Sequence, residues 1–489
     1  MRKPKFYITT AIDYVNAEPH IGHAYQKIIA DVLARWHKLL GENVFFLTGT
    51  DEHGQKIARS AEAEKLTEKQ FADKMSVKFK EAWKNLDVDF NRFIRTTDSD
   101  HEKAVQHFIE IINKKGDIYK SFYEGYYCTG CEAFFTEGEA NAENETCPIH
   151  QKKLEKLKEE TYFFKLSKYQ KKLLEFYKKN PNSILPDSRR NEIINRVKGG
   201  LQDLSITRTT FSWGVPFPLD KKHVTYVWFD ALINYLSGIG WPSKEYEKFW
   251  PADVHLLGKD NGWFHCVIWP AMLMSAGIDP AKTVFVHGFL TVNGQKISKS
   301  LGNVISPNYL IEKYGVDAVR YFILRNISFG DDGDFAEQAL KERHNNELAN
   351  KLGNLVSRVS GMCKGEIPKG KIDDDLASQL KLTSIMTHMN RLAPDKALNE
   401  IFEFIDKCNE YVQQKQVWKL EGTERDNALY SLVDSIRVIS LLLWPFMPST
   451  SKKINEQFSF ANPEIANTKF NLTKRGKIKR SDILFEKLE

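Results

Sequence analysis

The sequence predicts an α/β protein with a parallel sheet, a cysteine-containing insertion and a helical C-terminal region. Runs rich in β-branched and aromatic residues at 6–11, 43–48 and 284–290 are separated by helical patterns, as in β-α-β units. Beyond residue 348 the β-type runs disappear and helical periodicity remains, which favours a bundle. The sheet domain is predicted in two halves, 1–115 and 223–292, with an insertion at 116–222 between them. A loop and junction are predicted at 293–348, and the bundle at 349–489.

Bulk composition describes an ordinary globular protein with several domains. Its 489 residues exceed what one hydrophobic core normally serves. The net charge of +6, from 70 basic and 64 acidic residues, permits a polyanionic partner without requiring one. No apolar run precedes the first strand, and the most apolar segment, 438–447, is too short to span a bilayer. Together with the scattered cysteines, this predicts a cytoplasmic protein without a membrane partner.

The first strand leads through a short loop into a helix whose first turn carries His20 and His23. Two imidazoles beside the unpaired N–H groups of a helix start suit a triphosphate. Gly22 between them lets a nucleotide approach the backbone closely. Taken alone, the His-x-Gly-His quartet more often marks ordinary polar residues at a helix start. A nucleotide site is therefore one of two interpretations of this stretch.

The second strand, 43–48, is followed by an acidic cluster bounded by glycines that contains Asp51 and Glu52. Ligands of open parallel sheets collect at the carboxyl ends of strands, which favours a binding role. A polar turn that caps the next helix is the alternative. Residues 55–115 are predicted to be helical.

A metal-ligand pattern lies in the insertion. Cys128-x2-Cys131 is followed by Cys147-x2-His150. Three thiolates and one imidazole make a closed tetrahedral set for structural Zn²⁺, with no open position for catalysis. The alternative is a loop with unligated thiols.

A glycine-flanked basic loop holds Lys296 and Lys299 at 294–300. Such a loop is most often solvated surface. Paired with the histidine motif, it becomes a clamp that stabilises charge on transferring phosphates. Residues 309–324 are then predicted to form one helix leading away from the site.

The histidine motif and the lysine loop together resemble the HIGH and KMSKS motifs of class I aminoacyl-tRNA synthetases. The residues between them narrow the resemblance to methionyl-tRNA synthetases, over nearly the whole chain. The resemblance implies a Rossmann-type catalytic domain, a connective insertion with a zinc knuckle, and a helical anticodon-binding domain. It also implies an ATP-dependent ligase that forms methionyl-adenylate, with Mg²⁺ on the ATP, and transfers methionine to tRNA(Met).

The resemblance also implies residue roles. Asp51 would contact the amino group of methionine, Gly288 would lie near adenine, and Arg208 would act near the phosphates. The residues implied to act in catalysis or to bind ATP are His20, Gly22, His23, Lys296 and Lys299. Those implied to line the methionine pocket are Ile12, Tyr14, Trp228, Ala231, Tyr235, Phe264 and His265. Those implied to read the anticodon are Asn354, Arg358 and Trp418.

Two positions depart from the family pattern. Asp13 stands where an apolar or aromatic residue is expected, and the sequence offers no account of it. Trp418 follows Val417, where many relatives have proline. Because an apolar pocket discriminates weakly, at about 1–3 kcal/mol per methylene, a polar contact to the methionine sulfur is expected from Tyr14 or His265.

Rival interpretations make different predictions. The editing domain of leucine, isoleucine or valine enzymes does not fit in residues 116–222, and a cysteine enzyme places its zinc in the amino-acid pocket. A simpler nucleotidyltransferase leaves the insertion and bundle unexplained, whereas an RNA-binding descendant would lack the histidines or lysines.

No appended tRNA-binding domain follows the bundle, which predicts a monomer. The basic tail at 474–480 fits phosphate contact and a disordered end equally well.

Overall fold

The computed structural model describes residues 3–128, 133–135, 140, 144–147, 152–297, 302–461, 463–479 and 483–489. Its centre is a seven-stranded sheet with strand order β2-β3-β1-β12-β13-β8, to which β4 adds by pairing with β3. Each pairing in this sheet is parallel. The strands are β1 (Lys5–Thr10), β2 (Asp13–Tyr14), β3 (Asn43–Asp51), β4 (Arg92–Arg95), β8 (Ile184–Leu185), β12 (Val254–Gly258) and β13 (Thr283–His287).

Alternation along the strands divides the core between the two faces of the sheet. In β1, Phe6 and Ile8 belong to one buried cluster and Tyr7 to another. The first cluster also contains α1 and α3, and the second contains α4, α8, α9 and α10. The helices of this region are α1 (Ile21–Leu39), α2 (Gln55–Ala63), α3 (Glu68–Asn85), α4 (Ser99–Lys114), α8 (Val227–Leu232), α9 (Asn234–Ser237), η4 (Phe264–Ile268) and α10 (Trp269–Ala276).

The insertion forms its own antiparallel sheet, of order β6-β5-β7-β9, beside a two-stranded β10-β11 ladder. Its elements are β5 (Ile118–Cys128), β6 (Ala133–Phe135), β7 (Glu155–Phe164), α6 (Gln170–Lys179), α7 (Asp187–Lys198), β9 (Leu204–Ser205), β10 (Thr207–Arg208) and β11 (Val224–Thr225). The range assigned to the insertion also contributes β8 to the main sheet, where it pairs with β13.

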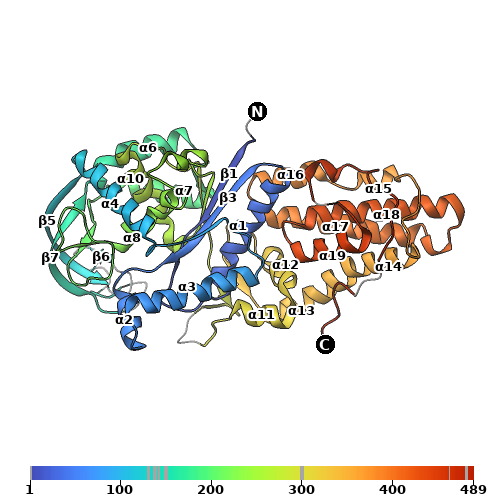
Figure 1. The fold of residues 1–489 in the computed structure, drawn as a ribbon, viewed down its shortest axis with the longest axis horizontal. Coiled ribbons are helices and arrows are strands. Elements are labelled where there is room, and N and C mark those ends of the chain that lie inside the picture. The colour runs from blue at the N-terminus through green and yellow to red at the C-terminus, as the bar shows by residue number, and fades with distance from the viewer. Residues whose placement is uncertain are drawn as a thin grey trace.

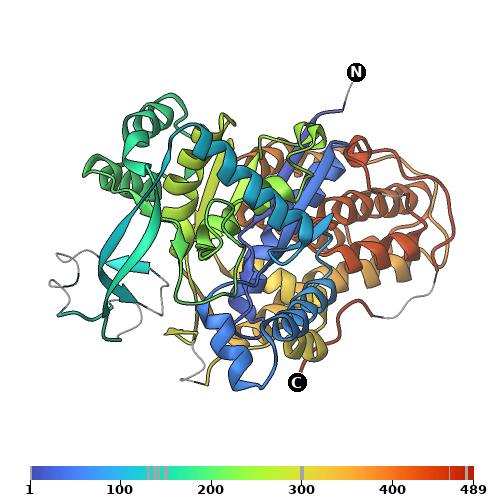
Figure 2. The same ribbon diagram turned by 60° about the vertical axis from the view of Figure 1, so that its left-hand side comes forward.

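The C-terminal region is helical, as the sequence predicts, and it packs on the α1 face of the sheet. The insertion and the bundle lie at opposite ends of the molecule (Figures 1 and 2). The bundle contains η6 (His344–Gly353), α14 (Asn354–Met362), α15 (Asp374–Ser378), α16 (Leu382–Asn390), α17 (Pro394–Gln414), α18 (Gly422–Leu443) and α19 (Pro448–Phe458). No helix in the described ranges is long and apolar enough to cross a bilayer.

The junction between sheet and bundle differs from the single helix predicted over 309–324. It holds α11 (Pro307–Tyr314) and α12 (Val316–Asn326), which are separated at Gly315, where φ is 81°. An L-residue rarely adopts that angle, so the glycine ends the first helix. A three-stranded sheet and α13 complete the junction: β14 (Leu290–Val292), β15 (Gln295–Lys296), β16 (Gly333–Phe335) and α13 (Glu337–Arg343).

Residues 55–115 are not wholly helical, because β4 lies between α3 and α4 and pairs with β3. Its sequence, Arg-Phe-Ile-Arg, is too short to give a clear alternation, and the sheet edge decides its conformation.

Candidate active site

The helix that carries the histidine motif begins at Ile21, with His20 as its N-cap. The Gly22 N–H donates to Nδ1 of His20 at 3.1 Å, and the His20 N–H donates to Nδ1 of His23 at 3.2 Å. The two rings stack with centroids 3.8 Å apart. The histidines therefore cap their own helix reciprocally, in the manner of a capping box.

Burial keeps both imidazoles neutral. It lowers the pKa of His20 to about 3, with a contribution from the charge of His23, and it lowers the pKa of His23 to about 3 as well. Because each Nδ1 accepts a backbone N–H, the single ring proton of each neutral imidazole sits on Nε2. The helix start therefore offers two neutral N–H donors of fixed orientation to a ligand.

Asp13, which the sequence left unexplained, pairs with a lysine on the same helix. Lys27 is fully buried, and its Nζ donates to Asp13 Oδ1 at 2.6 Å and to the Ala11 carbonyl at 2.9 Å. This buried pair ties the β1–α1 loop to the helix beneath the histidines. A buried charge is tolerated only with such partners.

The lysine loop meets the histidine helix. Lys296 lies on β15 with an exposed side chain, and the Asn303 amide donates to its carbonyl at 3.0 Å. A Cβ at Gly22 would lie 3.3 Å from Cδ1 of Ile297 and 3.0 Å from the His20 ring. The glycine therefore makes room for the folded-back ring and for the loop. Lys299 lies outside the described residues.

Asp51 ends β3 and is buried, and the next residue, Glu52, is held by its side chain and by its carbonyl. Glu52 accepts a bidentate contact from Arg95, with Nε and Nη2 at 2.7 and 2.8 Å from its oxygens. The Trp213 indole N–H donates to the Glu52 carbonyl at 2.6 Å, so the insertion range closes over this turn.

Asp230 lies at the centre of a buried cluster with two histidines. Its oxygens each lie 2.7 Å from a histidine nitrogen, Nδ1 of His53 and Nε2 of His101. Burial raises the pKa of this carboxyl, but the two histidines outweigh that effect and hold the pKa of Asp230 below its ordinary value. The cluster fixes α8 against the turn that carries Asp51.

Aromatic side chains lie close to the Asp230 cluster. Trp228 and Phe264 stack with ring centroids 4.2 Å apart, and both pack with Ile12 and Tyr14 against the buried cluster that contains Tyr235. Ala231 is buried on α8. The structure therefore brings the predicted apolar pocket residues into one region.

His265 uses both ring nitrogens. Its Nδ1–H donates to the Asn261 carbonyl at 3.0 Å, and its Nε2 accepts from the Tyr235 hydroxyl at 2.6 Å. Burial lowers the pKa of His265 to about 4, so the ring is neutral. With both nitrogens engaged, His265 positions Tyr235, and the polar contact from Tyr14 or His265 to the methionine sulfur stays a prediction.

At the end of β13, burial lowers the pKa of His287 to about 4 and its Nδ1 donates to the Gly288 carbonyl at 2.7 Å. A Cβ at Gly288 would lie 2.3 Å from the Asp331 carbonyl oxygen, so only glycine fits this approach.

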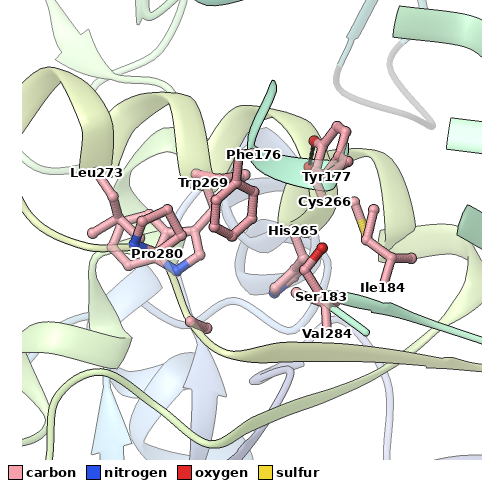
Figure 3. Close-up of a pocket in the computed structure, with 12 residues that line it drawn as sticks. Phe176, Tyr177, Ser183, Ile184, His265, Cys266, Trp269, Leu273, Pro280 and Val284 are labelled. Carbon is pink, nitrogen blue, oxygen red and sulfur yellow. Dashed lines mark hydrogen bonds between the residues drawn. The ribbon is translucent and has the colours of Figure 1, made fainter. Parts of the chain in front are cut away.

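His265 also lines a second, small pocket. This pocket is lined by α6, η4, α10 and the first residues of β8 and β13, with Tyr177, Cys266 and Trp269 among its residues (Figure 3). Of the predicted methionine-pocket residues, His265 alone lines it, so it is distinct from the predicted methionine site.

Sequence comparison decides the family. A family profile described as "tRNA synthetases class I (M)" matches residues 6–153 and 138–360. A methionine–tRNA ligase of Thermotoga maritima is 47% identical over 474 residues, covering 93% of this chain and 75% of that protein. One from Caldanaerobacter subterraneus subsp. tengcongensis is 45% identical, covering 100% of this chain and 79% of its own. The chain belongs to the methionyl-tRNA synthetases.

A solved methionyl-tRNA synthetase has the same fold. The structure described as "Mycobacterium tuberculosis methionyl-tRNA synthetase in complex with methionyl-adenylate" superimposes with a TM-score of 0.93 at 40% identity, covering 99% of each chain. The predicted α/β class with a parallel sheet and a helical C-terminal region is therefore confirmed for this synthetase.

Two of the four predicted zinc ligands of this synthetase come together. Cys128 and Cys147 are buried in one small cluster with Tyr126, Ala140 and Leu154. Paired buried thiols fit a soft divalent ion. Cys131 and His150 lie outside the described residues, so the knuckle stays a prediction.

Arg208 is buried at the base of the insertion. Its guanidinium donates to the Ser205 hydroxyl at 2.9 Å and to the Thr207 carbonyl at 2.7 Å, and it lies 4.4 Å from the ring centre of Tyr226. These partners tie the arginine to the β10–β11 ladder, and its role near the phosphates stays a prediction.

The predicted anticodon residues share one surface of the bundle. Asn354 is exposed on α14, and the Arg358 guanidinium on the same helix lies 5.8 Å from the ring centre of Trp418. The Trp418 side chain is 50% exposed, which is uncommon for so large an apolar ring. An exposed aromatic beside an arginine can stack on an unpaired base.

Sequence reasoning missed the buried residues that support the candidate site. Lys27 lies within the apolar stripe of α1, and that position was a usable indication of a buried partner. His101, Asp230 and Arg95 gave no indication, because their partners are distant in the sequence.

Proposed function

We propose that the chain is a methionine–tRNA ligase that activates L-methionine with ATP and transfers it to the 3′ end of tRNA(Met). The observation that carries the proposal is the meeting of two motifs: the lysine loop, at Ile297, lies against the helix start that holds His20 and His23. Membership of the methionyl-tRNA synthetases supports the same conclusion.

In the first step, the methionine carboxylate attacks the α-phosphate of ATP, and pyrophosphate leaves. The Nε2–H groups of His20 and His23 donate to phosphate oxygens, and Lys296 and Lys299 supply positive charge where negative charge grows. Magnesium would accompany ATP and offset part of the charge on its phosphates. Gly22 and Gly288 allow close approach of the nucleotide. Catalysis of this kind is mainly orientation and electrostatics.

Methionine binds between Asp51 and the aromatic cluster. The Asp51 carboxylate takes the ammonium group, and Trp228, Tyr235 and Phe264 surround the thioether, which gains from sulfur–aromatic contacts. The Asp230 cluster and His265 keep these side chains in place.

In the second step, a ribose hydroxyl at the 3′ end of tRNA attacks the activated carbonyl and AMP leaves. Asn354, Arg358 and Trp418 bind the anticodon at the far end of the molecule. Cys128, Cys131, Cys147 and His150 would hold a structural zinc ion that stabilises the insertion, and the shared burial of Cys128 and Cys147 supports this site. The monomeric state stays a prediction.

Amino-acid-dependent ATP–pyrophosphate exchange without tRNA tests the proposal. Exchange with methionine alone, out of the twenty amino acids, is the expected result. Exchange with another amino acid would keep the chemistry and overturn the pocket. Absence of exchange with any of them in zinc-loaded, folded protein would favour an RNA-binding protein without ligase activity.

A further inference from the structure

Three ligand-type side chains converge at the base of the insertion, away from the predicted cysteine site. Glu160 lies on β7, and Asp220 and His223 lie in the turn that precedes β11. Nε2 of His223 is 3.7 Å from Glu160 Oε1 and 3.7 Å from Asp220 Oδ2, and the three candidate ligand atoms all lie within 4.8 Å of one another.

His223 is held in place with one nitrogen lacking a partner. Its side chain is 1% exposed, and its Nε2 makes no hydrogen bond. Its Nδ1 lies 3.0 Å from the Thr207 hydroxyl, which also accepts the Tyr162 N–H at 3.0 Å. Cation binding requires the tautomer in which Nδ1–H donates to the Thr207 hydroxyl and Nε2 presents its lone pair to the side of the two carboxylates. A hydrogen bond to the second ring nitrogen is the usual arrangement behind a metal-binding histidine.

Both carboxylates are prepared as ligands. Asp220 Oδ1 accepts the Lys222 N–H at 3.1 Å, which leaves Oδ2 facing His223. Glu160 and Asp220 are both partly exposed. Carboxylates in contact with solvent are ionised at neutral pH, as metal binding requires.

Lys120 occupies the cation position in this structure. Its Nζ lies 2.8 Å from Glu160 Oε1 and 3.1 Å from Asp220 Oδ2, and its side chain is 39% exposed on β5. The ammonium balances the two carboxylates but leaves the buried Nε2 of His223 without a partner. A divalent cation would balance the same charge and also satisfy that nitrogen, while the flexible lysine turns to solvent.

We propose that Glu160, Asp220 and His223 bind a divalent transition-metal ion, with Zn²⁺ preferred. Ligand atoms about 2.0–2.1 Å from a tetrahedral Zn²⁺ are about 3.3 Å apart, so the observed separations from His223 need to contract by only a few tenths of an ångström. One imidazole and two carboxylates suit Zn²⁺ or Mn²⁺ better than Mg²⁺, which prefers oxygen ligands and keeps several waters.

Such an ion would fasten the insertion to the segment that enters the active site. Glu160 belongs to the insertion sheet, and His223 lies four residues before the start of α8 at Val227, the helix that carries Trp228. The ion would join the two at their shared base. Its role would be structural and separate from the predicted thiol site.

Metal content of the full chain tests the proposal. After chelation and reloading with Zn²⁺, we expect one equivalent more per chain in the wild type than in His223→Gln or Asp220→Asn. His388→Gln is the matched control, because His388 Nε2 lies 3.6 Å from the Glu400 carboxylate but lacks a second one. Equal zinc content in wild type, His223→Gln and Asp220→Asn, all folded by circular dichroism, would overturn the proposal.

Cobalt substitution separates this site from the thiol site. A thiolate site gives intense sulfur-to-cobalt charge-transfer absorption, whereas the proposed site gives only weak visible bands. We expect His223→Gln to remove the weak component and leave the charge-transfer band unchanged, whatever the occupancy of the cysteines. Loss of the thiolate band alone would contradict the assignment.

Lys120→Met tests the competition directly. Without the Lys120 ammonium, the carboxylates of Glu160 and Asp220 repel each other, and only an added cation can balance their charge. We expect Zn²⁺ to bind this variant at least about tenfold more tightly than the wild type, a difference of ~1.4 kcal/mol. Titration that detects no thiol-independent binding in either protein would show that the cluster is only an ion pair with Lys120.

Discussion

The catalytic half and the C-terminal bundle share a core but differ in what they bury. The sheet domain buries charged and titratable groups, among them Lys27, Asp230 and His255. In the bundle, the buried side chains of α17 are almost entirely apolar, and α18 has one buried ionic cluster at Asp434 and Arg437. The difference follows from where each half meets its ligand.

An active site must hold polar atoms in fixed positions away from water, so its supporting residues are also polar and buried. The bundle carries its predicted recognition residues on the surface, with Trp418 exposed, and can fill its interior with aliphatic side chains. The two halves meet in one cluster of buried side chains that runs from α1 to α18. This connection fixes the predicted anticodon residues relative to the candidate active site.

The largest expected effect concerns the joint between the halves. Arg320 on α12 is fully buried and donates to Asp31 of α1 at 2.6 Å and to the Pro445 and Phe446 carbonyls of the bundle, each at 2.9 Å. Arg320→Met would remove the guanidinium donor from both carbonyls and one of the two arginines that pair with the buried Asp31. We expect a loss of about 3–5 kcal/mol in the free energy of unfolding, measured by urea denaturation.

The control for this variant is Lys381→Met, which removes an exposed pair with Glu403. It should change stability by less than about 1 kcal/mol. Similar losses in the two variants would contradict a special role for the buried arginine.

The second prediction tests whether buried polarity in the sheet domain serves chemistry. His20→Ala removes one of the two Nε2–H donors. We expect methionyl-adenylate formation in single-turnover assays to slow about a hundredfold, or ~2.7 kcal/mol. His107→Ala, at an exposed histidine on α4, is the control. An unchanged rate for His20→Ala would remove this histidine from the mechanism.

The third prediction concerns the two lysines of the loop at 294–300. Lys296→Ala and Lys299→Ala should each lower the adenylation rate at least tenfold, ~1.4 kcal/mol or more. The exposed side chain of Lys296 predicts that its replacement leaves the unfolding midpoint unchanged. A parallel loss of stability in Lys296→Ala would show that the loop supports the fold rather than the reaction.

The last prediction concerns the acid stability of the two regions. His20 and His23 stay neutral in the folded protein down to about pH 3, whereas unfolded histidines take up protons below about pH 6.5. The unfolded state therefore binds more protons in this window, and the stability present above it is lost as the pH falls. Hydrogen exchange at about pH 5 should show protection falling in α1 before α17. Equal loss in both helices would contradict the comparison.

Much of the architecture could be predicted from local patterns. Runs of β-branched and aromatic residues predicted the β1, β3 and β13 segments, and helical periodicity predicted the bundle. The spacing of His20 and His23 placed both at one helix start, and the two motifs together indicated a nucleotide site. These features depend on residues two to four positions apart, whose geometry is set by the backbone itself.

Other features were decided by tertiary structure alone. Asp230 finds His53 across 177 positions of sequence, and Arg320 finds Asp31 across 289. The pairing of Lys27 with Asp13 explains a residue that the motif pattern could not. The split of 309–324 into α11 and α12, and the existence of β4, depended on a backbone angle at Gly315 and a neighbouring strand.

The sequence by itself determined the central strands, the helical bundle and the motifs that mark the candidate site, because composition, periodicity and motif spacing are local properties. Only the tertiary structure decided which buried charges pair, which nitrogen of each histidine carries the proton, and how the sheet joins the bundle. Those outcomes depend on which distant groups the folded chain brings within hydrogen-bonding distance, since a buried polar atom must find a partner wherever the fold supplies one.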